Sequence, residues 1–524
     1  MRIVLFLFSL CTGLYAQWQQ IPQLMATTNA APQTAKIVQT HPDQLALFWR
    51  TAGDQDGALY MQRFDYDGYL YDSAPGNPIT TLPANPREYC IDSNNQGEHF
   101  VLWRDIRQGF SGDLYAQLID AQGQILWQPD GKEWIKAPKK QSAPQCHWLD
   151  ADTLICSWID EPDSLVTMAF DRQGNPCWTR PIKVFLGHHN TLYHQCVTED
   201  KKITLVWRAK RPDQHIYAMR LNTRADTLGI WSLTKFPEAN PEINYISVDT
   251  KGSRTWVCWS EMISTTDRLY LNILDDHGPL LNSPSLASGT RFGSLHTTLT
   301  GDDLWVCYAD EADKGSLYLE KFDSTASRLI HRGIMHSQEY SIYPYSLDAH
   351  GVPDNGCLLF WQDSLSKVMR YDDKGDPLWH PTTGWILPPN SDYQTSAPDE
   401  LGGVIMILLH NGLLYGQRLS PQGYPGVPTG IEQAKHHAIE KFSCYPNPFT
   451  DNLTIPLPPR TGTVRVNIYN ILGQRIRQWT LSDSRTSIEW DGLLMNHRRA
   501  LPGMYLVEIQ WQDQKAISSV LCHH

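Results

Sequence analysis

The sequence predicts an all-β chain: an eight-bladed β-propeller of four-stranded repeats of about 52 residues, followed by a small Ig-like antiparallel β-sandwich. Three observations support this prediction. The 524 residues include 19 Trp, 35 Gly and 34 Pro, a composition typical of many short strands joined by turns. An apolar run that ends in an aromatic residue recurs with a constant period. A separate set of alternating strand patterns follows near the C-terminus.

The repeat is marked by the aromatic residue that ends its second expected strand. This central aromatic is found at Trp49, Trp103, Trp158, Trp207, Trp259, Tyr308 and Trp361, with a weaker eighth copy at Leu408-Leu409-His410. From Trp49 to Trp361 there are 312 residues in six steps, or 52 per step. In six of the eight units the third strand carries Tyr five residues before a turn residue, as in Tyr60 and Asp65. Four-stranded units of this period are typical of propeller blades.

Most hairpins after the third strand have a characteristic glycine. Six units carry Gly three residues beyond the turn residue, as at Gly68, because glycine adopts the left-handed conformation that such a turn needs. Ala225 and Ala326 take this place in two units. We therefore expect those two hairpins to be built differently.

The repeat arithmetic predicts the domain boundaries. Residues 17–430 form the expected propeller, 431–440 a linker and 441–524 the sandwich domain. The eighth unit lacks an outer strand after Gly423, whereas Trp18–Pro22 looks like such a strand standing alone. We expect the N-terminal segment to complete the eighth blade and close the ring. A seven-bladed ring with one degenerate copy and an open row of separate sheets are the alternatives.

The N-terminus predicts export. Arg2 precedes an apolar run from Ile3 to Cys11, and Ala16 is the small residue that a signal peptidase accepts, so residues 1–16 are expected to be a signal peptide. Ten cysteines then remain in an oxidising setting where disulfides are permitted, and a Cys444–Cys522 bridge is one open pairing. The net charge of −12 argues against a nucleic-acid partner.

Five motifs follow one another in the last 80 or so residues. They are Tyr445-Pro446-Asn447-Pro448-Phe449, Leu453-Thr454-Ile455, Ile468-Tyr469-Asn470-Ile471-Leu472-Gly473-Gln474, Trp490-Asp491-Gly492 and Leu501-Pro502-Gly503-Met504-Tyr505. On these motifs the segment resembles the type A C-terminal sorting domain of the type IX (Por) secretion system. The last ten residues depart from that family because they lack its usual basic finish.

The resemblance implies an export route. It implies passage across the outer membrane of a Gram-negative bacterium by the type IX translocon and removal of the domain by a sortase. It also implies release, or attachment to anionic lipopolysaccharide. The repeat body resembles propeller segments in cargo of that secretion system, which implies no activity.

Repetition argues against catalytic roles for the recurrent polar residues. In five units an acid lies two residues after the central aromatic, and we interpret these acids as turn caps: Asp105, Asp160, Glu261, Asp310 and Asp363. Cys90, Cys146 and Cys196 are interpreted as small buried side chains, although a metal-binding thiol cluster is the alternative. His188, His189 and His194 are expected in a polar loop. The sequence therefore assigns no catalytic residue, no metal ligand and no cofactor.

Two functional classes remain open. Tyr340, Tyr343 and Tyr345 are candidate stacking faces for a sugar, with blade packing as the alternative. We expect a non-catalytic exported propeller that binds a glycan, a protein or a surface component, an extracellular ligand that the sequence does not identify. The alternative is a secreted glycan- or peptide-active hydrolase, which should place convergent acids or a unique His in the propeller cup.

Overall fold

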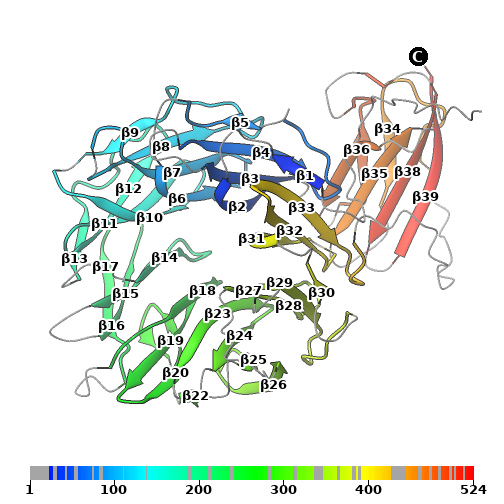
Figure 1. The fold of residues 1–524 in the computed structure, drawn as a ribbon. Helices are drawn as coiled ribbons and strands as arrows, with labels where there is room; N and C mark the ends of the chain where they lie inside the picture. The colour runs from blue at the N-terminus through cyan, green and yellow to red at the C-terminus, as the bar shows by residue number, and fades with distance from the viewer. Residues whose placement is uncertain are drawn as a thin grey trace, which may run out of the picture.

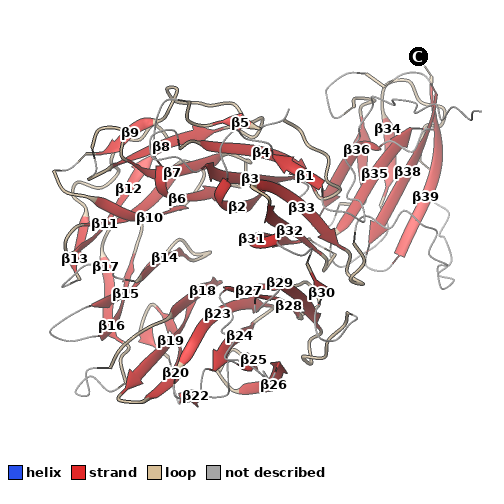
Figure 2. Cartoon of the chain, viewed as in Figure 1, coloured by secondary structure: helices blue, strands red, loops and turns tan. Residues whose placement is uncertain are grey.

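The computed structural model describes residues 23–523 with internal gaps. The gaps are residues 27–31, 42–43, 52–56, 73–75, 82–85, 110, 137, 187–191, 210–214, 236–240, 281–284, 290, 311–315, 336–345, 363–365, 380–384, 388–390, 400, 426–443, 458–462, 471–474, 482–484, 495–498, 501–502 and 512–513. The expected signal peptide and linker lie outside the described residues, as do Trp18–Pro22, His188, His189, Tyr340, Tyr343, Tyr345, Leu472, Gly473, Gln474 and Pro502. The described residues contain strands and no helix (Figure 2).

Eight antiparallel sheets make up the repeat region, and we number them as blades in chain order. Blade 1 contains β2 (Pro32–His41), β3 (Gln44–Thr51), β4 (Leu59–Asp65) and β5 (Asn77–Pro78). Blade 2 contains β6 (Pro86–Ser93), β7 (His99–Asp105), β8 (Asp113–Ile119) and β9 (Lys132–Ile135). Blade 3 contains β10 (Gln141–Trp148), β11 (Thr153–Asp160), β12 (Ser164–Asp171) and β13 (Ile182–Phe185), and blade 4 contains β14 (Tyr193–Val197), β15 (Ile203–Ala209), β16 (His215–Leu221) and β17 (Thr227–Ser232).

Blades 5 to 8 have the same plan. Blade 5 contains β18 (Ile246–Lys251), β19 (Arg254–Ile263), β20 (Thr266–Asp275), β21 (Gly278–Pro279) and an additional β22 (Ser285–Gly289). Blade 6 contains β23 (Phe292–Thr300), β24 (Asp303–Asp310), β25 (Ser316–Phe322) and β26 (Arg328–Met335). Blade 7 contains β27 (Ser346–Gly351), β28 (Cys357–Gln362), β29 (Ser366–Tyr371) and β30 (Trp385–Ile386), and blade 8 contains β31 (Ser391–Pro398), β32 (Val404–His410) and β33 (Leu413–Leu419) with β1 (Gln23–Ala26).

An N-terminal strand completes the last blade. β1 pairs antiparallel with β33, with Leu24 opposite Tyr415, so blade 8 has its fourth strand from the start of the chain. The inner strand of each blade contacts the inner strand of the next, and β31 of blade 8 contacts β2 of blade 1 (Figure 1). The sheets thus close into a ring, in agreement with the expected closure, although the closing strand lies at Gln23–Ala26. They are compatible with the eight-bladed prediction.

The recurrent aromatics are the packing units of the blades. Each central aromatic lies on the second strand, and in five blades the recurrent Tyr is its register partner on the third strand, as for Trp259 and Tyr270. The two rings stack in five blades, with centroids 5.4 Å apart for Trp49–Tyr60, 6.3 Å for Trp103–Tyr115, 5.7 Å for Trp207–Tyr217, 5.6 Å for Trp259–Tyr270 and 5.4 Å for Tyr308–Tyr318. Cross-strand aromatic pairs of this kind stabilise a sheet beyond their burial.

The expectation for Ala225 and Ala326 was wrong. Both residues adopt the left-handed conformation, with φ of 69° and 59°. Ala326 N also donates to Asp323 O at 2.9 Å, as Gly123 N donates to Asp120 O at 2.9 Å. The two hairpins therefore have the same turn as the others, because the Asp or Asn cap and the backbone hydrogen bond hold alanine in a conformation that usually favours glycine.

A small β-sandwich follows the ring. One sheet contains β36 (Arg475–Leu481), β35 (Val464–Asn470), β38 (Gly503–Trp511) and β39 (Gln514–Cys522), and the other contains β34 (Leu453–Pro456) and β37 (Ser487–Trp490). Its core includes Phe449, Trp490 and Tyr505, which all come from the quoted motifs. The Trp490 ring lies 5.2 Å from that of Phe449 and 5.4 Å from that of Tyr505. Cys444 and Cys522 are both buried, and the structure does not contain the bridge between them.

Candidate functional site

Neighbouring blades are joined by a recurrent hydrogen bond on the face that carries the hairpin turns. A cation two residues before the turn residue reaches the turn of the next blade. Examples are Arg63 Nη1 to Ala121 O at 2.9 Å, Lys321 Nζ to Asp373 O at 3.3 Å and Arg370 Nη1 to Pro421 O at 2.8 Å. Arg220 Nη1 donates to Leu274 O of blade 5 at 3.2 Å, and Arg418 Nη1 donates to the Asp67 carboxylate of blade 1 at 3.2 Å. These side chains link each of these blades to the next one. We call the boundary between two neighbouring blades a seam.

At two other seams, a side chain from a different position makes the link to the next blade. Leu118 and Ala169 stand at the cation position of blades 2 and 3. Lys132 Nζ donates to Gln173 O at 2.9 Å between blades 2 and 3, and Trp178 Nε1 donates to Thr223 O at 2.9 Å between blades 3 and 4.

The seam between blades 5 and 6 is different. Ile273 stands at the cation position, and among the described residues no side chain of blade 5 donates to the Ser324 carbonyl of the facing turn. This turn has Ala326 in place of glycine. In contrast, Gly174, Gly278 and Gly423 are each crowded by a tryptophan of the preceding blade, so that a Cβ there would lie 2.6 Å from the indole. Among the described residues, the link to the turn carbonyl that other blades make is therefore missing here, although Lys251 and Arg328 cross between the two blades elsewhere.

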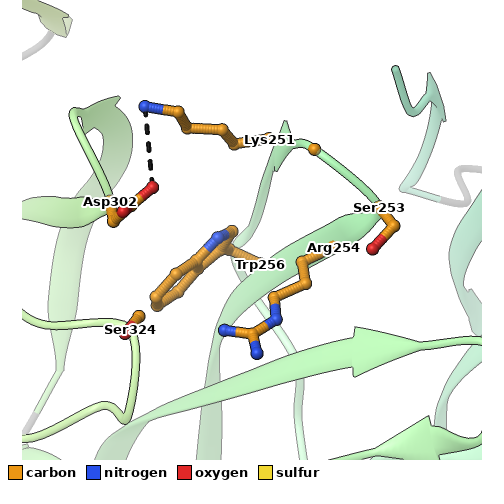
Figure 3. A pocket seen from close by; sticks show the side chains of 7 residues that line it. Lys251, Ser253, Arg254, Trp256, Asp302 and Ser324 are labelled. Carbon is orange, nitrogen blue, oxygen red and sulfur yellow. Dashed lines mark ion pairs between the residues drawn. The ribbon is translucent and has the colours of Figure 1, made fainter. Parts of the chain in front are cut away.

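A pocket of about 280 Å³ occupies this seam. Figure 3 shows its lining: Lys251, Gly252, Ser253, Arg254 and Trp256 of blade 5, and Asp302 and Ser324 of blade 6. Lys251 and Asp302 form an ion pair across one rim at 3.8 Å, and Lys251 also donates to Gly301 O. The Arg254 guanidinium has no hydrogen-bond or ion-pair partner among the described residues.

The pocket chemistry suits a small anionic ligand with hydroxyl groups. The Lys251 and Asp302 charges offset one another, so Arg254 supplies the unpaired positive charge. A guanidinium binds carboxylates and phosphates through paired hydrogen bonds. Trp256 provides an apolar wall, and the Ser253 and Ser324 hydroxyls can donate or accept hydrogen bonds. The volume is near the lower end of small-molecule pockets, roughly 300 to 1,000 Å³.

Titratable side chains also cluster on the inner strands of blades 6 to 8. His296 of β23 and His350 of β27 both lie beside Asp348, with Nε2 to carboxylate distances of 3.4 and 3.5 Å. Tyr393 of β31 donates to Asp348, and Ser396 Oγ lies 2.7 Å from His350 Nε2. Burial alone would raise the pKa of Asp348, but His350 and His296 hold it well below its usual range, while burial and Asp348 raise the pKa of Tyr393.

This inner-strand cluster lacks the geometry of a nucleophilic relay. In a Ser–His–Asp relay the carboxylate holds one imidazole nitrogen and the hydroxyl contacts the other. Here Asp348 and Ser396 both face Nε2 of His350. Other inner strands carry comparable bonds, such as Trp148 N to Asp92 Oδ2 at 2.7 Å and Thr297 to Asp249. The cluster thus extends a recurrent pattern that ties neighbouring inner strands together.

The expected turn-cap role of the recurrent acids is seen at Asp105. Its Oδ1 accepts from Arg107 N at 2.9 Å, and its Oδ2 accepts from Trp103 Nε1 at 2.9 Å. Glu261 Oε1 accepts from Trp259 Nε1 at 2.9 Å and from Lys235 N at 2.8 Å. Both acids bind the aromatic of their own repeat. Asp363 lies outside the described residues.

Two of the three cysteine positions follow the buried interpretation. Cys90 and Cys146 are both buried and adjoin in the core between blades 2 and 3, where burial and the neighbouring Cys90 raise the pKa of Cys146. Cys196 is half-buried, and burial raises its pKa to about 12. No group of three or more metal-ligating side chains occurs in the described part of the chain.

One histidine expectation was wrong. His194 lies on the inner strand β14 and not in a polar loop, and burial lowers its pKa. The pocket residues were missed by sequence reasoning. The available signal was Trp256, a second tryptophan three residues before the central Trp259, beside Lys251 and Arg254 in a short turn.

The sorting motifs that the structure describes have structural roles. Phe449, Trp490 and Tyr505 pack together as above. Asn447 Oδ1 accepts from Leu521 N at 2.8 Å, Asp491 Oδ1 accepts from Leu493 N at 3.0 Å, and Gly492 has φ of 71°. Pro446 and Pro448 follow cis peptide bonds, and Tyr445 is exposed. Tyr469 lies 3.3 Å from Glu508 Oε1, and Asn470 ends β35.

The fold is that of a β-propeller carrying a small β-sandwich. Residues 443–522 match the family described as "Secretion system C-terminal sorting domain". The C-terminal sandwich is therefore a sorting domain of the type IX secretion system, which indicates secretion or attachment at the cell surface and interaction with the secretion machinery. No helix that could span a membrane occurs in the described residues. No match to a curated protein was found.

Solved structures with similar folds include propeller proteins of several kinds. PorZ, a surface component of the type IX secretion system of Porphyromonas gingivalis, is 11% identical, with 95% of this chain and 82% of that chain covered and a TM-score of 0.32. The lectin BP39L of Burkholderia pseudomallei is 12% identical, covers 67% and 98%, and has a TM-score of 0.44. A prolyl endopeptidase is 13% identical and covers 76% of this chain, but only about half, 54%, of its own, with a TM-score of 0.42. At these identities the likeness concerns the fold.

Proposed function

We propose that this chain is an exported β-propeller that binds an extracellular glycan without catalysing a reaction, and that the pocket between blades 5 and 6 takes a sugar bearing a carboxylate. The unpaired Arg254 guanidinium beside Trp256 is the observation that carries this proposal. A carboxylate would pair with Arg254, the ring of the sugar would lie toward Trp256, and its hydroxyls would meet Ser253 and Ser324.

The proposal of binding without turnover rests on the pocket's titratable groups. Among the described residues that line the pocket, Asp302 is the only acid, and it is paired with Lys251. Glycoside hydrolysis ordinarily needs two carboxyl groups on opposite sides of the scissile bond. The inner-strand cluster has a single carboxylate, Asp348, which is already bound by Tyr393 and flanked by two histidines.

The export route belongs to the same proposal. A signal peptide at residues 1–16 would take the chain to the periplasm of a Gram-negative bacterium, and the translocon would carry it across the outer membrane. A sortase would then remove the sorting domain, and the propeller would be released or attached to anionic lipopolysaccharide. The proposed domain boundaries remain residues 17–430, 431–440 and 441–524.

The pocket assignment is tested by glycan binding. The purified full chain is expected to bind acidic sugars on a glycan array in preference to their neutral counterparts. Arg254→Gln should weaken that binding at least tenfold, since a hydrogen bond to a charged group contributes about 1.5 to 3 kcal/mol. Titration calorimetry with the best array ligand measures the change.

Arg224→Gln is the matched control. Arg224 lies exposed on the hairpin turn of blade 4 and is not part of the pocket, so this variant removes the same charge and should bind like the parent. Equal binding by Arg254→Gln and the parent, or the absence of any acidic-sugar binding, would contradict the proposal. Release of cleaved sugar that is lost in Asp348→Asn would instead support the hydrolase alternative.

A further inference from the structure

The hairpin turn of blade 1 is covered, unlike its counterparts. The residue two positions after the turn residue is exposed in the seven other blades: Gln122, Gln173, Arg224, His277, Thr325, Lys374 and Gln422. In blade 1 this residue is Asp67, whose side chain is only 18% exposed. Asp65 and Tyr66 beside it are each 1% exposed. A turn that is otherwise on the surface is therefore buried in one blade.

The cover is the sorting domain. Arg475, the first residue of β36, pairs with the carboxylates of both Asp65 and Asp67. Arg465 of the adjacent strand β35 lies over the Tyr66 ring, with 5.6 Å from its guanidinium carbon to the ring centroid. Arg475 retains 7% of its side-chain exposure and Arg465 is 4% exposed, so the contact excludes water on both sides. Figure 1 shows the two domains meeting near β1, β4 and β36.

The charges of the two parts complement each other. From Lys441 onward nine Lys and Arg stand against six Asp and Glu, giving +3 and leaving −15 for the rest of the chain. At the contact, Asp67 is shared between Arg475 and Arg418 of blade 8, which lies 3.2 Å away. Arg418 also pairs with Asp399 of its own blade at 2.8 Å. Arg418 of blade 8 thus holds the hairpin turn of blade 1 in place at the seam between the two blades.

We propose that the acidic turn Asp65-Tyr66-Asp67 is a docking site for the sorting domain, and that this domain stays bound to the propeller after the chain between them is cut. Proteolytic cleavage alone then does not release the propeller. Release requires a second step in which the contact with Arg475 and Arg465 is broken. The inference is independent of the pocket between blades 5 and 6.

The test uses the full chain with a site-specific protease sequence inserted within residues 431–440. After cleavage, the two fragments are expected to elute together from a size-exclusion column at low salt. They should separate in about 1 M salt, where the Debye length falls to about 3 Å. Arg475→Gln should separate at low salt, because it removes the charge of the sorting domain that pairs with both Asp65 and Asp67 across the contact.

Two further variants keep the outcome interpretable. Arg499→Gln removes an equal charge from an exposed pair with Asp451 inside the sorting domain, and its cleaved fragments should stay together. Asp67→Asn changes only the propeller fragment. It should weaken the association of the two cleaved fragments although the sorting domain is unaltered. Immediate separation of the parent fragments at low salt, or co-elution of the Arg475→Gln fragments with melting temperatures equal to the parent's, would overturn the proposal.

Discussion

Replacing Trp259 with alanine is expected to lower the free energy of unfolding by about 4 kcal/mol, in the usual range for a large aromatic in a core. Trp259 is fully buried, its ring stacks on Tyr270 with centroids 5.6 Å apart, and its Nε1 donates to Glu261 at 2.9 Å. The substitution opens a cavity and removes a donor from the buried Glu261 carboxylate. Urea unfolding followed by tryptophan fluorescence and circular dichroism measures the loss.

Leu280→Ala is the control in the same blade. Leu280 is 44% exposed, so its truncation should change the free energy of unfolding by no more than about 0.5 kcal/mol. A loss below about 1 kcal/mol for Trp259→Ala would show that the central aromatics are not the packing units of the blades.

Met25→Asp is the second substitution with a large expected effect. Met25 lies on the closing strand β1 and is 1% exposed, in a core cluster shared by blades 8 and 1. A carboxylate at this position should destabilise the closed ring by about 3 kcal/mol or more, through lost apolar burial and a buried charge. Hydrogen exchange should also show faster exchange of the β33 amides that face β1.

Leu24→Asp is the matched control for the closing strand. Leu24 is the preceding residue on β1 and is 40% exposed, so the same carboxylate meets solvent there and should have little effect. Equal effects of the two substitutions would mean that β1 does not pack with one face in the core.

The sequence predicted the blades well because each blade repeats a local pairing. A central aromatic and a Tyr at fixed spacing must face each other once the hairpin turn sets the register, as Trp259 and Tyr270 do. The closing strand was predicted from a missing fourth strand. Its expected place, Trp18–Pro22, lies outside the described residues, and the strand that the structure describes is Gln23–Ala26. The sorting domain was predicted from motif residues that turn out to build one aromatic core.

The pocket could not be predicted in the same way. It arises where Ile273 replaces a cation that crosses to the next blade, and only coordinates reveal that Arg63, Lys321 and Arg370 make that crossing elsewhere. The contact between the turn Asp65-Tyr66-Asp67 and the sorting domain could not be predicted from the sequence either. Asp65 has the ordinary spacing of a turn cap, and nothing local to the turn indicates that Arg475, 410 residues away, covers it. The prediction for the hairpins of Ala225 and Ala326 was wrong because the side-chain cap and the backbone hydrogen bond of each turn outweigh the usual preference of alanine against a positive φ.

Ring closure is tested most directly by a cysteine pair at Leu24 and Tyr415, which face each other across β1 and β33. Directly opposite residues have Cβ atoms about 4.5 to 5.5 Å apart, close enough for a disulfide after small adjustment. After mild oxidation, peptide mapping of the Leu24→Cys/Tyr415→Cys chain should recover a cross-linked peptide, and the displaced pair Leu24→Cys/Leu413→Cys should give much less. Failure of the Leu24–Tyr415 pair to cross-link in folded protein would contradict a ring that its first strand closes.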